Sequence, residues 1–115
     1  TLGADALTIG IAGIQRCRWF FVRKEPKGRG TNKLIEGSPI GSGDHCLVIE
    51  DAITTGGSLL KAMDAVEETG AKVVAVSTLV DRGEIARPLI EARGIFYYPI
   101  ATYLDLGIEP VEPPS

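Results

Sequence analysis

The sequence has few of the residues that build redox and metal sites: two of its 115 residues are cysteines and one is a histidine. Cys17 and Cys46 lie far apart, with no further Cys or His at ligand spacing. This spacing excludes a disulfide framework and a metal cage made of these residues, and it suits a reducing cytoplasm. His45 is the only histidine, and we interpret it as a residue at the start of a strand rather than a catalytic base.

Long apolar runs are also missing. No stretch approaches the ~20 residues that a membrane-spanning helix needs, so we expect no membrane insertion. The net charge of −3 and the pI of about 5.1 argue against a general nucleic-acid-binding surface. Basic residues are nevertheless concentrated in one segment, because residues 16–33 hold seven of the twelve Lys and Arg beside a single acid, Glu25.

The length suits one compact domain, so we expect residues 1–115 to form a single domain that is short for a complete α/β enzyme. The chain begins at Thr1 instead of Met. Its first five residues have neither the basic start nor the apolar core of a signal peptide. We therefore expect a fragment or a processed product.

Hydrophobic patterning predicts alternating helices and strands. The most regular helix begins at Ser58, places Leu59, Met63 and Val66 on one stripe, and ends at Gly70. The other predicted elements are a helix over 4–14, a strand over 19–22, a loop over 23–32, an extended return over 33–36, turns over 38–44, strands over 46–49, 73–80 and 95–100, a helix over 88–93, and an irregular tail over 109–115.

This alternation predicts an α/β fold with a parallel sheet, right-handed crossovers and helices on both faces. The apolar run Cys46–Ile49 is typical of a buried central strand, and the strand over 19–22 is also expected to be buried. Ligands of such sheets bind at the carboxyl ends of the strands.

One segment at such a strand end has the chemistry of a phosphate site. An apolar strand is followed by two carboxylates, Glu50 and Asp51, then by a small-residue loop and the helix that begins at Ser58. Thr and Gly at a helix start leave N–H groups free for an anion, and the helix dipole favours negative charge there. Adjacent carboxylates cannot bind phosphate, but they can accept hydrogen bonds from two neighbouring hydroxyls. The order of these groups suits ribose 5-phosphate.

An ordinary strand-to-helix turn with two solvated acids is the alternative interpretation. Agreement between the loop and its fold context favours the phosphate site. The Walker pattern G-x-x-x-x-G-K-[ST] and the G-x-G-x-x-G fingerprint are both absent, which disfavours nucleoside triphosphates and dinucleotides.

The segment Val48–Ser58 resembles the signature of the type I phosphoribosyltransferases, which bind phosphoribosyl pyrophosphate (PRPP). The resemblance implies a Rossmann-like core in which Glu50 and Asp51 contact the ribose hydroxyls, with Asp51 nearest the reacting carbon. The implied PRPP-binding residues of this segment are Glu50, Asp51, Ala52, Ile53, Thr54, Thr55, Gly56, Gly57 and Ser58, of which Thr54 to Ser58 hold the 5-phosphate.

The basic segment resembles the loop R-K-E-x-K-x-H-G of orotate phosphoribosyltransferases, which reaches over the pyrophosphate, commonly of the neighbouring subunit. The matching positions are Arg23, Lys24, Glu25, Lys27 and Gly30, while Arg29 replaces the usual histidine. The replacement keeps the positive charge and leaves a proton-donor role open. A solvated charged loop is the alternative.

A third match is Leu79-Val80-Asp81-Arg82, at the end of the strand over 73–80. A local Asp-Arg pair is the alternative interpretation. In orotate enzymes the arginine of this element contacts orotate, as does the threonine that matches Thr54. A planar guanidinium suits a base that carries a carboxylate, whereas purines carry none.

The resemblance covers nearly the whole chain and implies transfer of ribose 5-phosphate from PRPP to orotate, with catalytic Lys27 and Asp51. It also implies Mg²⁺ bound with PRPP, no metal held by the protein itself, and a homodimer with shared active sites. Family members have a further N-terminal segment with a hood, a strand and a pyrophosphate loop, so the fragment alone is expected to be inactive. Another PRPP-dependent base transferase and a PRPP-sensing regulator remain alternatives.

Overall fold

The computed structural model describes Thr8, residues 17–23 and residues 34–112. Thr8 is helical, but the remainder of the helix predicted over 4–14 lies outside the described residues, as does nearly all of the loop predicted over 23–32. None of the helices in the described part of the chain is long and apolar enough to cross a membrane.

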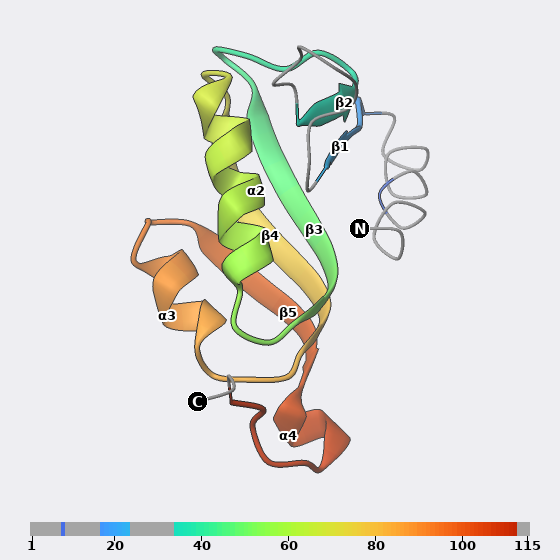
Figure 1. The fold of residues 1–115 in the computed structure, drawn as a ribbon, viewed down its shortest axis with the longest axis vertical. Coiled ribbons are helices and arrows are strands. Elements are labelled where there is room, and N and C mark those ends of the chain that lie inside the picture. Colours follow the sequence, from blue (N-terminus) through green and yellow to red (C-terminus); the bar gives the residue numbers. More distant parts are fainter. Residues whose placement is uncertain (1–7, 9–16, 24–33, 113–115) are drawn as a thin grey trace.

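The centre of the fold is a parallel sheet of three strands in the order β3-β4-β5 (Figure 1). These strands are β3 (His45–Ile53), β4 (Lys72–Asp81) and β5 (Phe96–Thr102). Helix α2 (Gly57–Glu68) connects β3 to β4, and α3 (Ala86–Glu91) connects β4 to β5. The predicted α/β fold with a parallel sheet is therefore confirmed. All three strands direct their carboxyl ends toward one edge, where ligands of such sheets bind.

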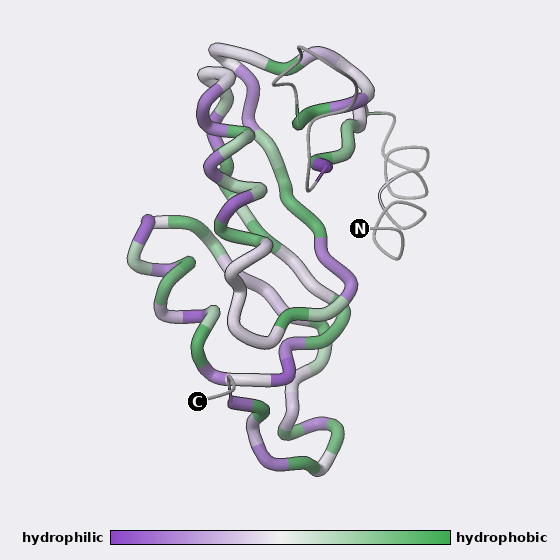
Figure 2. Tube along the Cα trace, in the orientation of Figure 1, coloured by the Kyte–Doolittle hydropathy of each residue, from purple (hydrophilic) through white to green (hydrophobic). Residues whose placement is uncertain are grey.

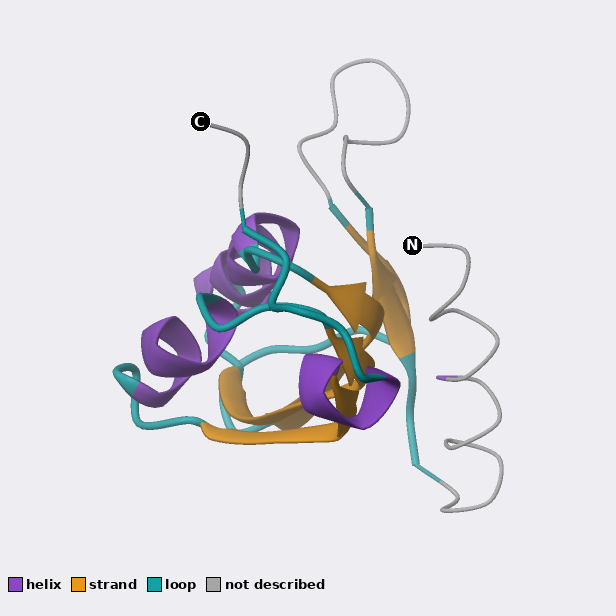
Figure 3. Ribbon diagram, turned by 90° about the horizontal axis from the view of Figure 1, so that it is seen from below, coloured by secondary structure: helices purple, strands orange, loops and turns teal. Residues whose placement is uncertain are grey.

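Helices α2 and α3 pack on the same face of the sheet, as the end-on view shows (Figure 3). Helix α2 alternates hydrophilic and hydrophobic segments along its length (Figure 2), so one stripe faces the strands. The largest side chains that are fully buried in this core are Leu59, Met63 and Val66 of α2, Ile90 of α3, and Val73, Val76 and Thr78 of β4. Gly70 follows α2 with a φ of +92°, the left-handed conformation that favours glycine just after a helix.

The opposite face of the sheet remains open among the described residues. Phe96, Tyr98 and Ile100 alternate along β5 on this face and are 62–65% exposed, with the rings of Phe96 and Tyr98 stacked at 6.3 Å. Leu47 lies in the same row as Phe96, because both pair with Ala75 across the sheet. The described helices thus cover one face, and cover on the other face stays a prediction, because most of the helix predicted over 4–14 lies outside the described residues.

Strand β3 also differs from its prediction. It begins at His45 and runs through both carboxylates to Ile53, so Glu50 and Asp51 lie within the strand. Among the described strands it pairs with β4 alone and is an edge strand, while β4 occupies the centre. Its burial alternates from Cys46, which is buried, to Leu47, which is exposed. An apolar run was therefore an insufficient sign of a strand buried on both faces.

A two-stranded antiparallel sheet precedes the core and consists of β1 (Phe20–Val22) and β2 (Ile35–Gly37). The two predicted segments are confirmed as strands, but β1 is only half-buried rather than buried. Gly37 ends β2 with a φ of +119°, and a Cβ there would lie 2.9 Å from the carbonyl oxygen of Trp19. The turn that follows is fixed by Asp44, whose carboxylate accepts a hydrogen bond from the N–H of Gly41.

The C-terminal part contains one helix that was not predicted. Helix α4 (Tyr103–Leu106) follows β5 directly and begins with a capping box, in which Thr102 and Asp105 bond reciprocally. The pattern Thr-x-x-Asp is a sign of a helix start, but a segment of only one turn gives too short a hydrophobic pattern to predict a helix. Helix α3 begins at Ala86, two residues before the predicted start, and Pro88 falls within its first turn.

Candidate functional site

The predicted phosphate loop lies at the carboxyl end of β3 and surrounds a cavity of about 240 Å³. All of its lining residues come from one continuous segment, residues 50–59. This segment contains every residue between Glu50 and Ser58 that the sequence assigned to PRPP. The structure therefore brings the two acids and the Thr/Gly loop together around a single concave site.

The start of α2 leaves backbone donors for an anion. Gly56 is its N-cap residue, no side chain caps the helix, and its first turn contains no acidic residue. The first intrahelical bond runs from the N–H of Leu60 to the carbonyl of Gly56 at 2.9 Å, so the preceding N–H groups have no helical partner. Such a helix start favours a phosphate group.

Gly56 is required by both its backbone and its surroundings. Its φ of +84° is in the left-handed region, and a Cβ at this position would lie 2.9 Å from the Cβ of Ala86. The loop thus packs directly against the start of α3. This contact limits how closely the phosphate loop can approach α3.

The two acids, Glu50 and Asp51, line the same loop cavity. The Asp51 carboxylate accepts a hydrogen bond from the N–H of Ala52 at 2.8 Å, and Glu50 accepts one from the N–H of Asp51 at 3.3 Å. Both acids are partly exposed. Oxygen atoms of both carboxylates are therefore placed where hydroxyls of a sugar could donate to them.

The two residues predicted to contact the base, Thr54 and Arg82, lie side by side in the structure. The Arg82 Nη2 donates a hydrogen bond to Oγ1 of Thr54 at 2.8 Å. The backbone of Arg82 is also tied to the loop, since its N–H donates to the carbonyl of Ile53 at 2.8 Å. Arg82 is therefore beside the cavity, and the alternative of a purely local Asp-Arg pair is wrong because the guanidinium bonds Thr54 instead.

The turn that carries Arg82 is held between the C-terminal segment and the phosphate loop. The Arg82 carbonyl accepts a hydrogen bond from the N–H of Val111 at 2.7 Å, which attaches the C-terminal segment to the site. A Cβ on Gly83 would lie 2.8 Å from the Val111 carbonyl oxygen and 2.9 Å from that of Thr54. Only glycine fits at this position.

Asp81 and Tyr97 form a buried pair directly behind this turn. The Tyr97 hydroxyl donates to Oδ2 of Asp81 at 2.7 Å, and the N–H of Gly83 donates to Oδ1 at 3.1 Å. Burial, followed by the hydrogen bond to Asp81, raises the pKa of Tyr97 well above its usual range. Tyr97 therefore remains a hydrogen-bond donor at any physiological pH.

Of the predicted pyrophosphate residues, the structure describes Arg23 alone. Arg23 lies just after β1, and its Nη1 pairs with Oε2 of Glu36 at 2.8 Å. Its N–H also donates to the carbonyl of Leu34 at 2.7 Å, which closes the base of the loop. The other basic residues assigned to this loop, Lys24, Lys27 and Arg29, lie outside the described residues.

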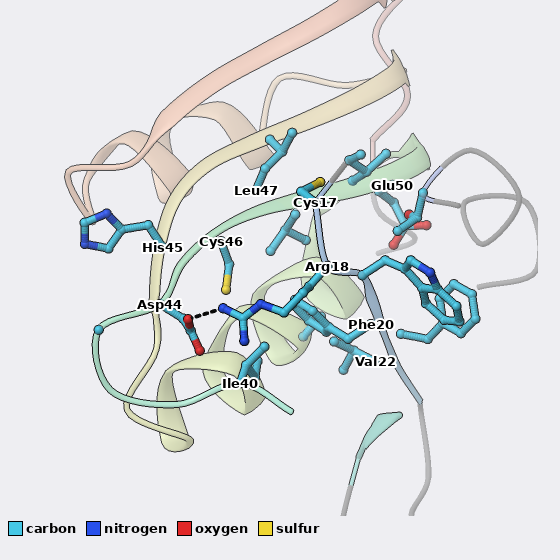
Figure 4. Close-up of a pocket in the computed structure, with 17 residues that line it drawn as sticks. Cys17, Arg18, Phe20, Val22, Ile40, Asp44, His45, Cys46, Leu47 and Glu50 are labelled. Carbon is cyan, nitrogen blue, oxygen red and sulfur yellow. Dashed lines mark hydrogen bonds and ion pairs between the residues drawn. The ribbon is translucent and has the colours of Figure 1, made fainter. Parts of the chain in front are cut away.

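A larger cavity of about 440 Å³ lies between β1 and β3 and shares only Glu50 with the loop cavity (Figure 4). Its labelled side chains include Phe20, Val22 and Ile40, and an ion pair joins Arg18 to Asp44. Hydrogen bonds from Gly41 and Arg18 lower the pKa of the Asp44 carboxyl. This cavity lacks the loop donors of the smaller one, so size does not identify the candidate site.

Comparison with known proteins agrees with this geometry. The family model described as "Phosphoribosyl transferase domain" matches residues 4–92. The chain belongs to the phosphoribosyltransferase family. Its match includes the acids, the phosphate loop and Arg82.

Several of the individual proteins to which the chain is similar are orotate phosphoribosyltransferases. The chain is 43% identical over 111 residues to the orotate phosphoribosyltransferase of Mycobacterium tuberculosis, covering 95% of this chain and 62% of that protein. The structure of the same enzyme in complex with PRPP has a TM-score of 0.65 at 42% identity, covering 80% of this chain and 51% of that one. The orotate phosphoribosyltransferase of Aeropyrum pernix has a TM-score of 0.74 at 32% identity, covering 86% of this chain and 55% of that one. The chain thus spans about three-fifths of the length of the curated phosphoribosyltransferases that it matches.

Three residues of the site were not assigned a role from the sequence. Gly83 follows Arg82 directly, and a glycine just after a strand-end motif is a detectable sign of close backbone approach. Tyr97 and Val111 come from segments further along the chain. Nothing in their local sequence indicates contact with this turn.

Proposed function

We propose that the protein to which this chain belongs transfers ribose 5-phosphate from PRPP to N1 of orotate. The products are orotidine 5-monophosphate and pyrophosphate, with inversion at the anomeric carbon. This reaction belongs to de novo pyrimidine biosynthesis, and a cytoplasmic location fits the two free cysteines, Cys17 and Cys46. Residues 1–115 would form the core domain of this enzyme.

One observation supports the proposal more than any other: the bond from Arg82 to Thr54. It places a guanidinium, which suits a carboxylate, at the rim of a loop that suits a phosphate. Purines and uracil carry no carboxylate. A cation in this position therefore favours orotate as the base.

The PRPP-binding roles follow the order of groups around the loop cavity. The residues Thr54, Thr55, Gly56, Gly57 and Ser58 would hold the 5-phosphate through N–H and hydroxyl donors at the start of α2. Glu50 and Asp51 would accept hydrogen bonds from the ribose hydroxyls, with Asp51 nearest the reacting carbon. Ala52 and Ile53 would contact PRPP from the end of β3.

Catalysis would consist of charge stabilisation rather than covalent attack. The carbon–oxygen bond to pyrophosphate breaks ahead of full bonding to orotate, so negative charge grows on the leaving group while the sugar becomes cationic. Lys27, with Arg23, Lys24 and Arg29, would stabilise the pyrophosphate and exclude water. Asp51 would stabilise the cationic sugar.

The described residues do not form a metal cage, because no group of three or more His, Cys, Asp or Glu side chains lies close enough to hold a metal ion. We propose that Mg²⁺ arrives with PRPP and is held mainly by its oxygen atoms, because Mg²⁺ commonly binds phosphate oxygens. Glu50 and Asp51 are the nearest carboxylates that could assist. When bound, the ion would neutralise charge on the pyrophosphate.

We further propose a homodimer in which the basic loop of one subunit serves the site of the other. The resemblance to orotate phosphoribosyltransferases motivates this arrangement, since their basic loop commonly reaches over the pyrophosphate of the neighbouring subunit, and the segment 16–33 of this chain concentrates seven of its twelve basic residues. A shared site requires a two-fold interface that brings the two segments together.

The test uses the full-length protein, with PRPP and one base at a time. Orotate, uracil, hypoxanthine and adenine are supplied at equal concentration, and nucleotide products are separated by chromatography. We expect orotate to give by far the largest kcat/KM. Preference for another base would show a different transferase, and PRPP binding without turnover of any base would favour a sensor.

A further inference from the structure

The orientation of Arg82 depends on a buried carboxylate that does not itself face the loop cavity. Asp81 is 3% exposed, and both of its carboxylate oxygens accept hydrogen bonds. Oδ1 accepts the N–H of Gly83, which closes a tight turn around Arg82. Oδ2 accepts the hydroxyl of Tyr97 in the neighbouring strand β5.

Tyr97 is itself fixed from two directions. It is 5% exposed in the core between the sheet and α3. The guanidinium carbon of Arg87, in α3, lies 5.1 Å above the centre of its ring, a distance at which cation and ring attract. The hydroxyl of Tyr97 is thus a rigid donor aimed at Asp81.

Loss of this donor would affect the turn specifically. A buried carboxylate oxygen without a hydrogen bond is costly, so Asp81 would rotate toward other donors or admit water. Either change weakens its bond to the N–H of Gly83. Gly83 has no spare room, since it lies against the carbonyls of Thr54 and Val111, and any displacement there moves Arg82 relative to Thr54.

We propose that Tyr97 is a positioning residue for base binding, which acts through Asp81 and the turn at Gly83 to hold Arg82 beside Thr54. The proposal rests on the orotate-transferring function proposed above. Tyr97 and Asp81 are buried behind the turn and touch no substrate in this arrangement. Their effect should therefore fall mainly on the base, because the phosphate loop has a further support of its own in the contact of Gly56 with Ala86.

The experiment compares Tyr97→Phe with Tyr98→Phe in the full-length protein. The two tyrosines are adjacent in β5, but Tyr98 is 62% exposed on the opposite, open face of the sheet. We expect Tyr97→Phe to lower kcat/KM for orotate about 10- to 150-fold, the range of one lost hydrogen bond to a charged group. The dissociation constant of PRPP, measured by calorimetry, should stay within about twofold. Tyr98→Phe should change neither constant.

A second variant covers the case in which Tyr97→Phe does not fold. Asp81→Asn keeps an oxygen for the N–H of Gly83 while it alters the partner of Tyr97, and it should reproduce the selective loss of orotate use. A variant that loses orotate and PRPP binding equally, or that loses thermal stability with both constants unchanged, would overturn the positioning role. The wild type serves as the separate check, because its failure to use orotate would contradict the proposed function itself.

Discussion

Arg82 donates a hydrogen bond from Nη2 to Oγ1 of Thr54 at 2.8 Å, and this bond joins two motifs that are 28 residues apart in the sequence. Thr54 belongs to the phosphate loop, whereas Arg82 ends the next strand of the sheet. A guanidinium has five N–H donors in a planar arrangement. Because Thr54 accepts one of these hydrogen bonds, the guanidinium is held in a fixed orientation. Its other N–H groups can still donate to a carboxylate.

Arg82→Ala should therefore weaken the use of orotate while leaving PRPP binding nearly intact. Loss of one charge-assisted contact should cost roughly 2 to 4 kcal/mol in kcat/KM for orotate. Steady-state kinetics on the full-length protein give this value, and calorimetry gives the dissociation constant of PRPP. An unchanged orotate constant beside a damaged PRPP constant would show that Arg82 serves the phosphate side.

Arg93→Ala provides the matched control. Arg93 likewise makes a single side-chain interaction, in this case an ion pair with Asp64 at 2.8 Å, but this pair lies between α2 and the turn before β5. Its removal deletes the same charge away from the loop cavity. Equal losses in both variants would indicate a general charge effect instead of recognition of the base.

Much of this site was predictable because its parts are contiguous in the sequence. The acids, the phosphate loop and the first residues of α2 form one segment, so local pattern was sufficient to place them around one cavity. Arg82 was also predictable, since parallel strands end at the same edge of a sheet. The signal in each case was a polar group at the end of an apolar strand.

The remainder depended on contacts between distant segments. Tyr97 alternates with exposed aromatic neighbours in β5, and only the pairing of Val76 with Tyr97 shows that it lies on the helix face. The position of β3 at the edge of the sheet that the described strands form could not be predicted either, because strand order is set by tertiary pairing and not by the composition of one strand. Helix α4 has only four residues, too few for hydrophobic periodicity to predict a helix.

The close packing of Gly56 against Ala86 leads to a second prediction. Gly56→Ala should both destabilise the protein and weaken PRPP binding, because the new Cβ would lie 2.9 Å from Ala86 in a left-handed conformation. Gly43→Ala separates these two effects, since Gly43 has a φ of +91° but nothing lies within 4 Å of the position that its Cβ would occupy.

Gly43→Ala should lower the free energy of unfolding by about 1 to 2 kcal/mol, the cost of the left-handed backbone alone. Gly56→Ala should lose roughly 1 to 3 kcal/mol more through overpacking against α3. Denaturant unfolding measures both values, and calorimetry measures the affinity for PRPP. If Gly43→Ala weakens PRPP binding as much as Gly56→Ala does, the contact with Ala86 does not determine the position of the phosphate loop.

A third prediction concerns alkaline pH. The pKa of Tyr97 is raised above its ordinary value of 10.0, chiefly by burial and then by the bond to Asp81. A raised pKa in the folded state contributes stability that is complete below the unfolded value and declines as the pH rises above it. Between about pH 10 and pH 11, unfolded chains should ionise Tyr97 while folded chains do not.

The free energy of unfolding of the wild type should therefore fall with pH more steeply than that of Tyr97→Phe. The difference in slope should approach about 1 kcal/mol per pH unit above pH 10. Cys46 and Tyr103, whose pKa values are also raised, are present in both proteins and cancel in the comparison. Parallel slopes would mean that Tyr97 ionises in the folded protein and is not a permanent donor to Asp81.

The last prediction tests which subunit supplies the basic loop. In the full-length protein, Lys27→Ala and Asp51→Asn should each be severely impaired as homodimers, because one lacks a pyrophosphate cation and the other the carboxylate beside the ribose. If active sites are shared, a mixed dimer has one site that contains both defects and one that contains neither. Mixing the two variants under conditions of subunit exchange should then restore activity.

The size of the recovery makes this test quantitative. Random exchange of equal amounts gives mixed dimers in half of the population, and half of their sites are intact, so activity should approach about a quarter of the wild-type value. Native mass measurement checks that exchange has taken place. A mixture of each variant with itself is the control and should regain nothing. If mixed dimers form and activity stays absent, Lys27 acts within its own subunit, because every site would then retain one of the two defects.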